Sequence, residues 1–230
     1  MGQTTEVTLF PWDSNSDAHV ELLVKQRVEC SWHQEKVETE WKGQQLRGEK
    51  CIYWIVLSSP DSQVDAEDEK LQDTASSINA VARQPTKARF TPIGHISLDS
   101  KNVEIEHLDL DLPSENIFWI KTFYIRQHIQ GQGIGRAAMN EVETMAVQEP
   151  LNAKTLMLDT VQKDDQKNEE FANVTYGGIP KTTNEEWYSR RGYRLVKTVQ
   201  NFYRVADKNG KIWDIKTVFM RKDIAASDSK

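Results

Sequence analysis

Three closely spaced glycines, Gly131, Gly133 and Gly135, form the part of the sequence best suited to hold phosphate groups. They follow an apolar run, 117–125, that predicts a strand, and they precede a helical pattern over 134–148. Glycines let the backbone bend and approach a ligand closely, and the first turn of a helix presents unpaired N–H groups and a partial positive charge. We therefore expect this turn to bind a phosphorylated cofactor.

Two kinds of phosphate-binding turn fit these glycines. The first is the dinucleotide-binding turn of an oxidoreductase, because 133–138 matches the pattern G-x-G-x-x-A and Asp159 ends the next predicted strand. However, the mostly polar segment 126–130 separates the first strand from the glycines, and a hairpin rather than further strand–helix units follows. A dinucleotide-binding oxidoreductase is therefore the less favoured alternative.

The second kind of turn agrees with a motif further along the chain. The segment 130–135 resembles the Q/R-x-x-G-x-G/A acetyl-CoA motif of the GNAT superfamily of N-acetyltransferases, including an aliphatic residue, Ile125, upstream of it. The segment 187–193 is similar to the Y-x-x-x-G-F/Y element of the same family. The resemblance implies an α/β (α+β) fold with a mixed, mostly antiparallel central sheet of about six to seven strands flanked by helices. It also implies that the strands over 117–125 and 155–159 run parallel and splay apart.

The resemblance further implies that acetyl-CoA is the cosubstrate. Backbone N–H groups of residues 131 and 133–136 would bind the pyrophosphate, and the end of the preceding strand would pair with the pantetheine arm. The guanidinium of Arg136 either supports the pyrophosphate or is an ordinary solvated side chain of the helix. The cofactor-binding residues expected from the motif are Phe123, Tyr124, Ile125, Gln130, Gly131, Gln132, Gly133, Ile134, Gly135 and Arg136.

Two residues are expected to carry catalysis if the family layout holds. Tyr188 matches the position of the proton donor to the departing thiolate, although it could instead be packed at the sheet edge. Asp159 occupies the position where some members carry a base, although an aspartate that caps a turn is an equal alternative. His95 and Glu106 are fallback bases, and for His95 we favour the interpretation of a satisfied strand histidine.

The acceptor would be a primary amine of a small molecule or peptide that attacks the thioester directly in a ternary complex. Trp32, His33 and His95 are the expected substrate contacts, and Trp32 and His33 could instead cover the core. The sequence does not identify the acceptor amine. An alternative from another class is a coenzyme A-binding sensor or scaffold that has lost catalysis.

Residues 1–224 are expected to form a single N-acetyltransferase domain, followed by a flexible tail over 225–230. The polar segment 60–91 is too long for a hairpin connection and is predicted to be an insertion, mobile or partly helical. The polar segment 161–181 is predicted to be a surface loop or a lid over the acceptor. Neither segment is given a catalytic role.

Periodicity predicts the elements that hold these residues. Strands are expected over 6–10, 51–57 and 93–98, the last two paired, and helices over about 16–28 and 37–41, separated by a linker at 30–33. A helix over 184–190 stops at Gly192. A hairpin of 193–206 and 211–220 turns at Asn209-Gly210, which is the strongest short hairpin signal.

Composition limits the possible partners. The net charge is −6 and the cationic residues are scattered, so no nucleic-acid surface is expected. Cys30 and Cys51 do not have a metal-binding spacing, and we expect no metal, no disulfide and no membrane span. The absence of a signal peptide favours a cytoplasmic protein. Both a monomer and a homodimer stay open.

Overall fold

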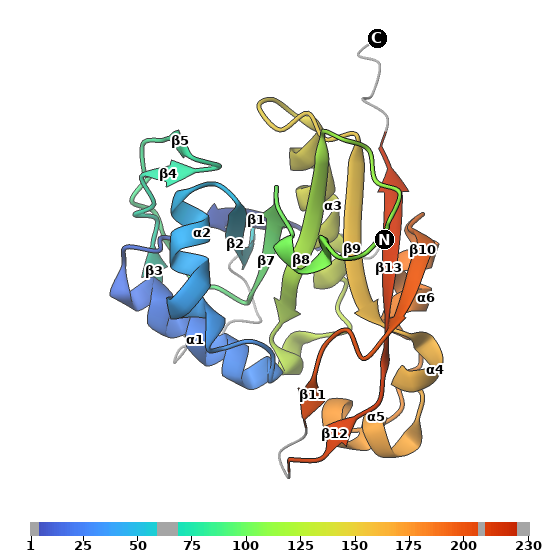
Figure 1. Cartoon of the computed structure of the whole chain (residues 1–230). Helices are drawn as coiled ribbons and strands as arrows, with labels where there is room; N and C mark the ends of the chain where they lie inside the picture. Colours follow the sequence, from blue (N-terminus) through green and yellow to red (C-terminus); the bar gives the residue numbers. More distant parts are fainter. Residues whose placement is uncertain (1–4, 59–68, 207–209, 225–230) are drawn as a thin grey trace. The chain divides into compact units, whose positions relative to one another are not determined.

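The computed structural model describes residues 5–58, 69–206 and 210–224. The chain divides into two compact units. Unit 1 consists of residues 1–105 and 118–153, and unit 2 consists of residues 106–117 and 154–230. Figure 1 labels the helices and strands of both.

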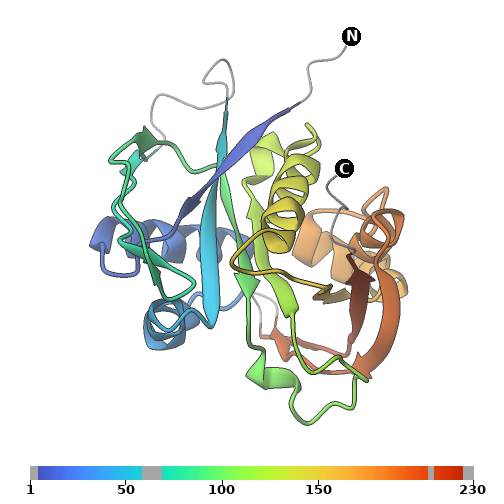
Figure 2. The ribbon, with the colours of Figure 1, turned by 90° about the horizontal axis from the view of Figure 1, so that it is seen from above.

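The main sheet in the described part of unit 1 is formed by antiparallel strands in the order β1-β2-β7-β8. The paired strands predicted over 51–57 and 93–98 are confirmed, with Trp54 opposite His95. Strand β2 is apolar on both faces because helices cover both sides of the sheet, as Figure 2 shows edge-on. The strands are β1 Val7–Pro11, β2 Lys50–Leu57, β7 Gly94–Asp99 and β8 Ile117–Ile125, of which only Ile117 belongs to unit 2.

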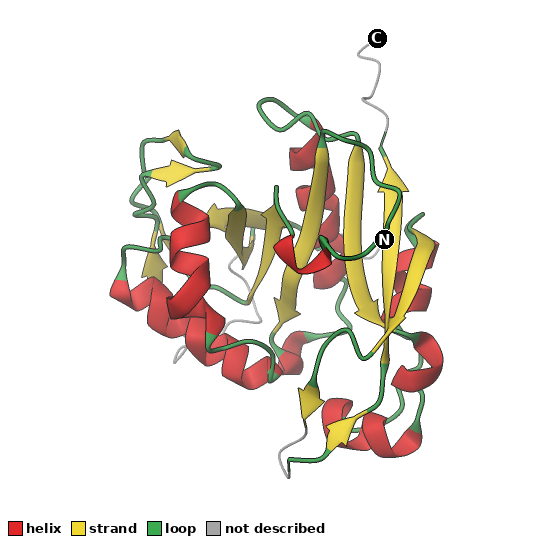
Figure 3. Cartoon of the chain, viewed as in Figure 1, coloured by secondary structure: helices red, strands yellow, loops and turns green. Residues whose placement is uncertain are grey.

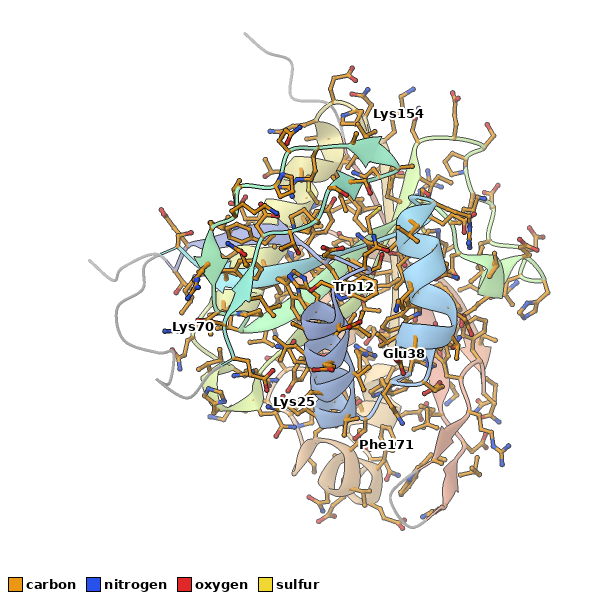
Figure 4. The ribbon with its side chains drawn as sticks, turned by 90° about the vertical axis from the view of Figure 1, so that its left-hand side faces the viewer. Trp12, Lys25, Glu38, Lys70, Lys154 and Phe171 are labelled. Atoms are coloured by element: carbon orange, nitrogen blue, oxygen red, sulfur yellow. The ribbon has the colours of Figure 1, made fainter. Side chains whose placement is uncertain are left out.

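The predicted helices of unit 1 are present. One face of the sheet carries α1 and the helical run η1–α2, which lie side by side in Figure 4, and the other face carries α3. Helix α1 ends because Ser31 adopts a left-handed conformation, and its N–H group bonds back to the carbonyl of Val28. The helices are α1 Asp17–Cys30, the π-helix η1 Val37–Trp41, α2 Lys42–Leu46 and α3 Ile134–Val147, with short 3₁₀ turns η2 Val103–Ile105 and η3 Gln127–Ile129.

The core of unit 1 is rich in tryptophan. Trp12 and Trp54 are almost fully buried, and each indole N–H finds an acceptor on His19, the first on its carbonyl and the second on its Nδ1, both at 3.0 Å. These bonds remove the cost of burying the two donors. Members of this core are Trp12, Val20, Leu22, Leu23, Val37, Trp41, Ile52, Trp54, Leu71 and Phe90.

The predicted insertion is not helical in its described part, residues 69–91. It forms two short antiparallel pairs, β3 Leu71–Gln72 with β6 Arg89–Phe90 and β4 Ser77–Ile78 with β5 Val81–Ala82. Leu71 and Phe90 join the core, and the Asp73 carboxylate accepts bonds from Arg83 and Thr86. Although the segment is mostly polar, Leu71 and Phe90 attach it to the core, and the hydrogen bonds of Asp73 order its loop. Residues 60–68 lie outside the described residues.

The main sheet in the described part of unit 2 is formed by antiparallel strands in the order β9-β13-β10. They are β9 Thr155–Val161, β13 Lys216–Asp223 and β10 Arg194–Gln200. The two arms of the predicted hairpin pair as expected, but each is interrupted: β10 and β13 form the main pair, and β11 Val205–Ala206 and β12 Ile212–Trp213 form a separate short pair. Residues 207–209, which include part of the predicted turn, and residues 225–230 lie outside the described residues. The expected parallel pair, 117–125 with 155–159, has one strand in each unit.

Helices occupy the segment expected to be a surface loop or lid. Figure 3 shows α4 Lys163–Gln166 and α5 Glu169–Tyr176, followed by the predicted helix α6 Asn184–Arg190. Asn168 caps α5 by accepting the N–H of Phe171, and the Phe171 ring is 1% exposed. A good cap and one buried aromatic ring therefore make this polar segment helical.

Candidate active site

The glycine turn of unit 1 has the backbone that the motif predicts. Gly131 and Gly133 adopt φ values of 82° and 83°, which disfavour any residue with a Cβ. Gly133 is the N-cap of α3, and the Gln130 side chain donates from Nε2 to the carbonyl of Ile125 at 2.7 Å. This bond ties the turn to the end of the strand that precedes it.

The residues of this turn fit a pyrophosphate. No side chain caps α3 in the described part of unit 1, so the N–H groups of its first turn point out of the helix as they do in anion sites. The Arg136 side chain folds over the turn, with Nη2 3.7 Å from the place that a Cβ on Gly133 would take. The dipole of α3 adds positive potential at the same end.

The end of β8 lies tightly against β7. A Cβ on Gly94 would come within 2.1 Å of the carbonyl oxygen of Tyr124, so only glycine fits there. The register shifts between His95 and Ser97, and Thr122 on β8 has a φ of 49°. A bulge therefore changes the direction of β8 just before the residues expected to meet the pantetheine arm.

Tyr124 is 7% exposed, and its hydroxyl donates to Glu29 Oε2 at 2.9 Å. Burial and the nearby Glu29 carboxylate raise the pKa of Tyr124. Phe123 lies beside the glycine turn, where its ring is 3.5 Å from the place of a Cβ on Gly135. The strand end and the glycine turn of unit 1 are therefore one packed structure.

His95 has no exposed surface. Its Nδ1 bonds to Gln26 Oε1 at 2.8 Å and its Nε2 to Arg27 Nη1 at 3.3 Å, so the ring holds its proton on Nδ1 and is neutral. Burial, with Arg27 and Lys50 nearby, lowers the pKa of His95 well below its usual value. The expected substrate contact of His95 needs an exposed surface that this residue does not have.

Trp32 and His33 lie in the predicted linker between α1 and η1 and are half-buried. Their rings are 5.9 Å apart, and the Trp32 carbonyl accepts a bond from Arg27 Nε at 2.7 Å. Burial and the cations Lys36 and Arg27 lower the pKa of His33. The linker is therefore fixed by a buried arginine while it still presents two partly exposed rings.

Tyr188 lies on α6 in unit 2, a helix that begins with a capping box of Thr183 and Glu186. Its side chain is 9% exposed, with the Trp187 and Tyr193 rings at 5.0 and 5.9 Å. Burial and the nearby Asp159 carboxylate raise the pKa of Tyr188. The phenol therefore stays protonated at neutral pH.

Asp159 lies inside β9 rather than at its end, which corrects the prediction, because the strand continues to Val161 opposite β13. Its Oδ2 accepts a bond from the Tyr203 hydroxyl at 3.0 Å. The structure therefore does not support a turn-capping role for Asp159.

Glu106, the second fallback base, and the neighbouring Glu104 do not lie on a strand. Glu104 is part of the 3₁₀ turn η2 and bonds to Lys36 and Lys121 at 2.7 and 3.1 Å. Burial alone would raise the pKa of Glu104, but the two lysines lower it to about 2. Glu106 is exposed in the connection that opens unit 2.

A model of the acetyltransferase (GNAT) family matches residues 44–175. The chain belongs to this family. Among proteins with curated descriptions, none matches the sequence significantly.

Solved structures share the GNAT fold at low sequence identity. Arabidopsis thaliana NAA60 in complex with a bisubstrate analogue is 16% identical, with a TM-score of 0.55 and coverage of 95% of this chain and 99% of that chain. The aminoglycoside 6′-N-acetyltransferase from Enterococcus faecium is 15% identical, with a TM-score of 0.52 and coverage of 95% and 97%. An aminoglycoside 6′-N-acetyltransferase complexed with coenzyme A is 16% identical, with a TM-score of 0.52 and coverage of 95% and 97%.

The GNAT fold leaves the dinucleotide alternative without support. The strand before the glycines, β8, pairs antiparallel with β7, whereas a dinucleotide-binding turn belongs to a parallel, doubly wound sheet. Within the described residues, no group of three or more His, Cys, Asp and Glu side chains could hold a metal ion. No helix in that part of the GNAT chain is long and apolar enough to cross a membrane.

Sequence reasoning missed Tyr203, His107 and Phe202 of this GNAT protein. The His107 and Phe202 rings are stacked at 6.1 Å, and the Phe202 and Tyr203 rings meet at 4.7 Å. Residues 202 and 203 fell within a predicted strand, and residue 107 in a connection without a motif. No sequence signal joined them, because their contact depends on tertiary structure.

Proposed function

We propose that the protein is an N-acetyltransferase that moves the acetyl group of acetyl-CoA to a primary amine of a small molecule or peptide. The observation that carries the proposal is the glycine turn of unit 1. Gly131 and Gly133 have left-handed φ values, and the Gln130 side chain bonds to the Ile125 carbonyl, so the turn directs the first-turn N–H groups of α3 outwards. The chain also belongs to the GNAT family. Acetyl-CoA supplies the thioester, whose carbonyl carbon forms a bond to the amine nitrogen as its bond to sulfur breaks.

Tyr188 is proposed as the general acid. Its raised pKa keeps the proton on the phenol oxygen, so the hydroxyl donates a hydrogen bond to the departing sulfur and passes its proton there as negative charge develops on that atom. The burial of its ring between Trp187 and Tyr193 restricts the direction in which the hydroxyl points. Unit 2 therefore supplies a protonated and oriented donor.

Asp159 is proposed as the group that takes the proton from the amine, directly or through a water molecule. The bond from Tyr203 to Oδ2 fixes the carboxylate plane, and Asp159 is half-buried rather than fully buried on β9. The same negative charge raises the pKa of Tyr188. One carboxylate thus serves both proton transfers.

The test is release of thiol from acetyl-CoA with a panel of amines, combined with titration of coenzyme A. The Tyr188→Phe variant should bind coenzyme A as the wild type does, with kcat lower by about 100-fold. Coenzyme binding without thiol release from any amine would identify a sensor or scaffold. Stabilisation by NAD but not by acetyl-CoA would overturn the proposal.

The oligomeric state, a monomer or a homodimer, stays a prediction, as does the cytoplasmic location. Sedimentation of the purified chain measures the oligomeric state. Tagged protein followed by microscopy in the source cells measures the location.

A further inference from the structure

Three aromatic side chains and a carboxylate form a continuous row in unit 2. His107 and Phe202 stack with an interplanar angle of 14°, and the Phe202 and Tyr203 rings meet edge to face at 79°. The Tyr203 hydroxyl then donates to Asp159 Oδ2 at 3.0 Å. The row therefore leads from the exposed His107 ring to a negative charge.

The outer end of this row is accessible and its inner end is anchored. His107 is exposed, and Phe202 and Tyr203 are half-buried. On its inner side, the Phe202 ring meets the fully buried Phe219 ring at 5.0 Å and 86°. A ligand ring would therefore meet a surface that is already in place, which lowers the entropic cost of binding.

We propose that this row is the acceptor-binding site for an aromatic primary amine. The aryl group of the amine stacks on the His107–Phe202 pair, and its ammonium group faces the Asp159 carboxylate. Because the Tyr203 ring separates Phe202 from Asp159, a short aliphatic chain joins the two ends of the ligand. The inference rests on the proposed function, since it names the class of amine on which Asp159 acts.

Ring stacking, rather than apolar burial alone, defines the preference. An aromatic ring gains binding free energy from the quadrupoles of Phe202 and His107, and a saturated ring of similar area does not. A competing arrangement places the ammonium group itself over the Phe202 ring, where a cation is attracted regardless of what else the ligand carries. The two arrangements differ in how they treat saturated rings and small cations.

The experiment compares 2-phenylethylamine with 2-cyclohexylethylamine, at saturating acetyl-CoA, by thiol release. The wild type should favour the aromatic amine about fivefold in kcat/KM, the ratio expected for one aromatic pair. Phe202→Leu and His107→Leu should bring that ratio close to one. Tyr176→Leu, which removes a partly exposed aromatic ring of α5 outside the row, should keep the wild-type ratio. Circular dichroism of each variant confirms that it folds.

An equal kcat/KM for the two amines in the wild type, or a ratio that both leucine variants keep, would overturn the proposal. If tetramethylammonium inhibits the acetylation of 2-phenylethylamine with a Ki as low as the KM of that amine, the proposal is overturned in favour of a cation over the ring. If no amine releases thiol, the proposed function fails, and calorimetric titration of both amines into the protein with coenzyme A decides the inference separately. Preferential binding of 2-phenylethylamine then supports the site, and equal binding overturns it.

Discussion

The Tyr203 hydroxyl donates a hydrogen bond to Asp159 Oδ2 at 3.0 Å. This bond connects the segment just before β11 to strand β9. Asp159 is also close enough to raise the pKa of Tyr188. The carboxylate is therefore the shared neighbour of two tyrosines in unit 2. One tyrosine orients the carboxylate, and the other is kept protonated by it.

Tyr203→Phe should lower kcat/KM by about tenfold, because a hydrogen bond to a charged group contributes about 1.5 kcal/mol or more. Asp159→Asn should lower kcat/KM further, since it removes the proposed proton acceptor itself. Steady-state thiol release with one amine measures both. The matched control is Tyr176→Phe on α5, which should retain the wild-type value. Wild-type kinetics in Tyr203→Phe would show that this bond does not serve catalysis.

Gln130→Ala should weaken coenzyme A binding by roughly fivefold, the loss expected for one neutral hydrogen bond of about 1 kcal/mol. The lost bond is the one from Gln130 Nε2 to the Ile125 carbonyl, which holds the turn against the strand. Calorimetric titration of coenzyme A measures the change. Gln127→Ala is the control, because Gln127 is exposed in the neighbouring 3₁₀ turn. Equal affinities of the two variants would contradict this role of Gln130.

Local signals in the sequence were sufficient for most of the elements. The helix over 184–190 is present within its predicted bounds because Thr183 and Glu186 form a capping box and Gly192 follows the last turn. The strand over 117–125 is equally well bounded, because a long apolar run has few alternatives to a buried strand. The left-handed φ values of Gly131 and Gly133 agree with the expectation that glycines mark the turn.

Features that depend on tertiary contacts were not predictable in the same way. The described part of the 60–91 insertion is ordered by Leu71 and Phe90, which reach the core from a polar segment. The sequence favours a satisfied strand histidine at His95, which is confirmed, but it does not identify the partners, Gln26 and Arg27 on α1. The stacking of His107 on Phe202 joins segments far apart in the chain. Propensity carries no information on such contacts.

Gly133→Ala should lower the free energy of unfolding by about 1–2 kcal/mol, because an L-residue is strained at its φ of 83°. Gly135→Ala should lower the free energy of unfolding much less. Gly135 is helical, and the alanine Cβ would meet the Phe123 ring at 3.5 Å, which is an ordinary contact. Urea unfolding of the two variants beside the wild type measures the difference. Equal losses in the two variants would mean that strain at Gly133 is not the cause.

The unfolding free energy should fall as the pH drops below about 6.5, in part because of His19. Its Nδ1 accepts bonds from the Asp13 N–H at 3.1 Å and the Trp54 indole at 3.0 Å, and its Nε2 donates to the Gln72 carbonyl at 3.0 Å. Protonation of Nδ1 would break both bonds that it accepts, because its new N–H would point at the N–H groups of Asp13 and Trp54. Burial, opposed by the hydrogen bond to Gln72, lowers the pKa of His19 in the folded chain.

The sign of the effect follows from proton counts. Below about pH 6.5 the unfolded chain binds a proton at residue 19 that the folded chain does not, so stability is complete above that pH and falls by up to about 1.4 kcal/mol per pH unit below it. His95, whose pKa is also lowered, adds a loss of the same sign. His19→Gln should reduce the slope between pH 7.5 and 5.5, as measured by urea unfolding. The exposed His128, changed to Gln, should leave it as in the wild type, and a His19→Gln slope equal to that of the wild type would refute the assignment.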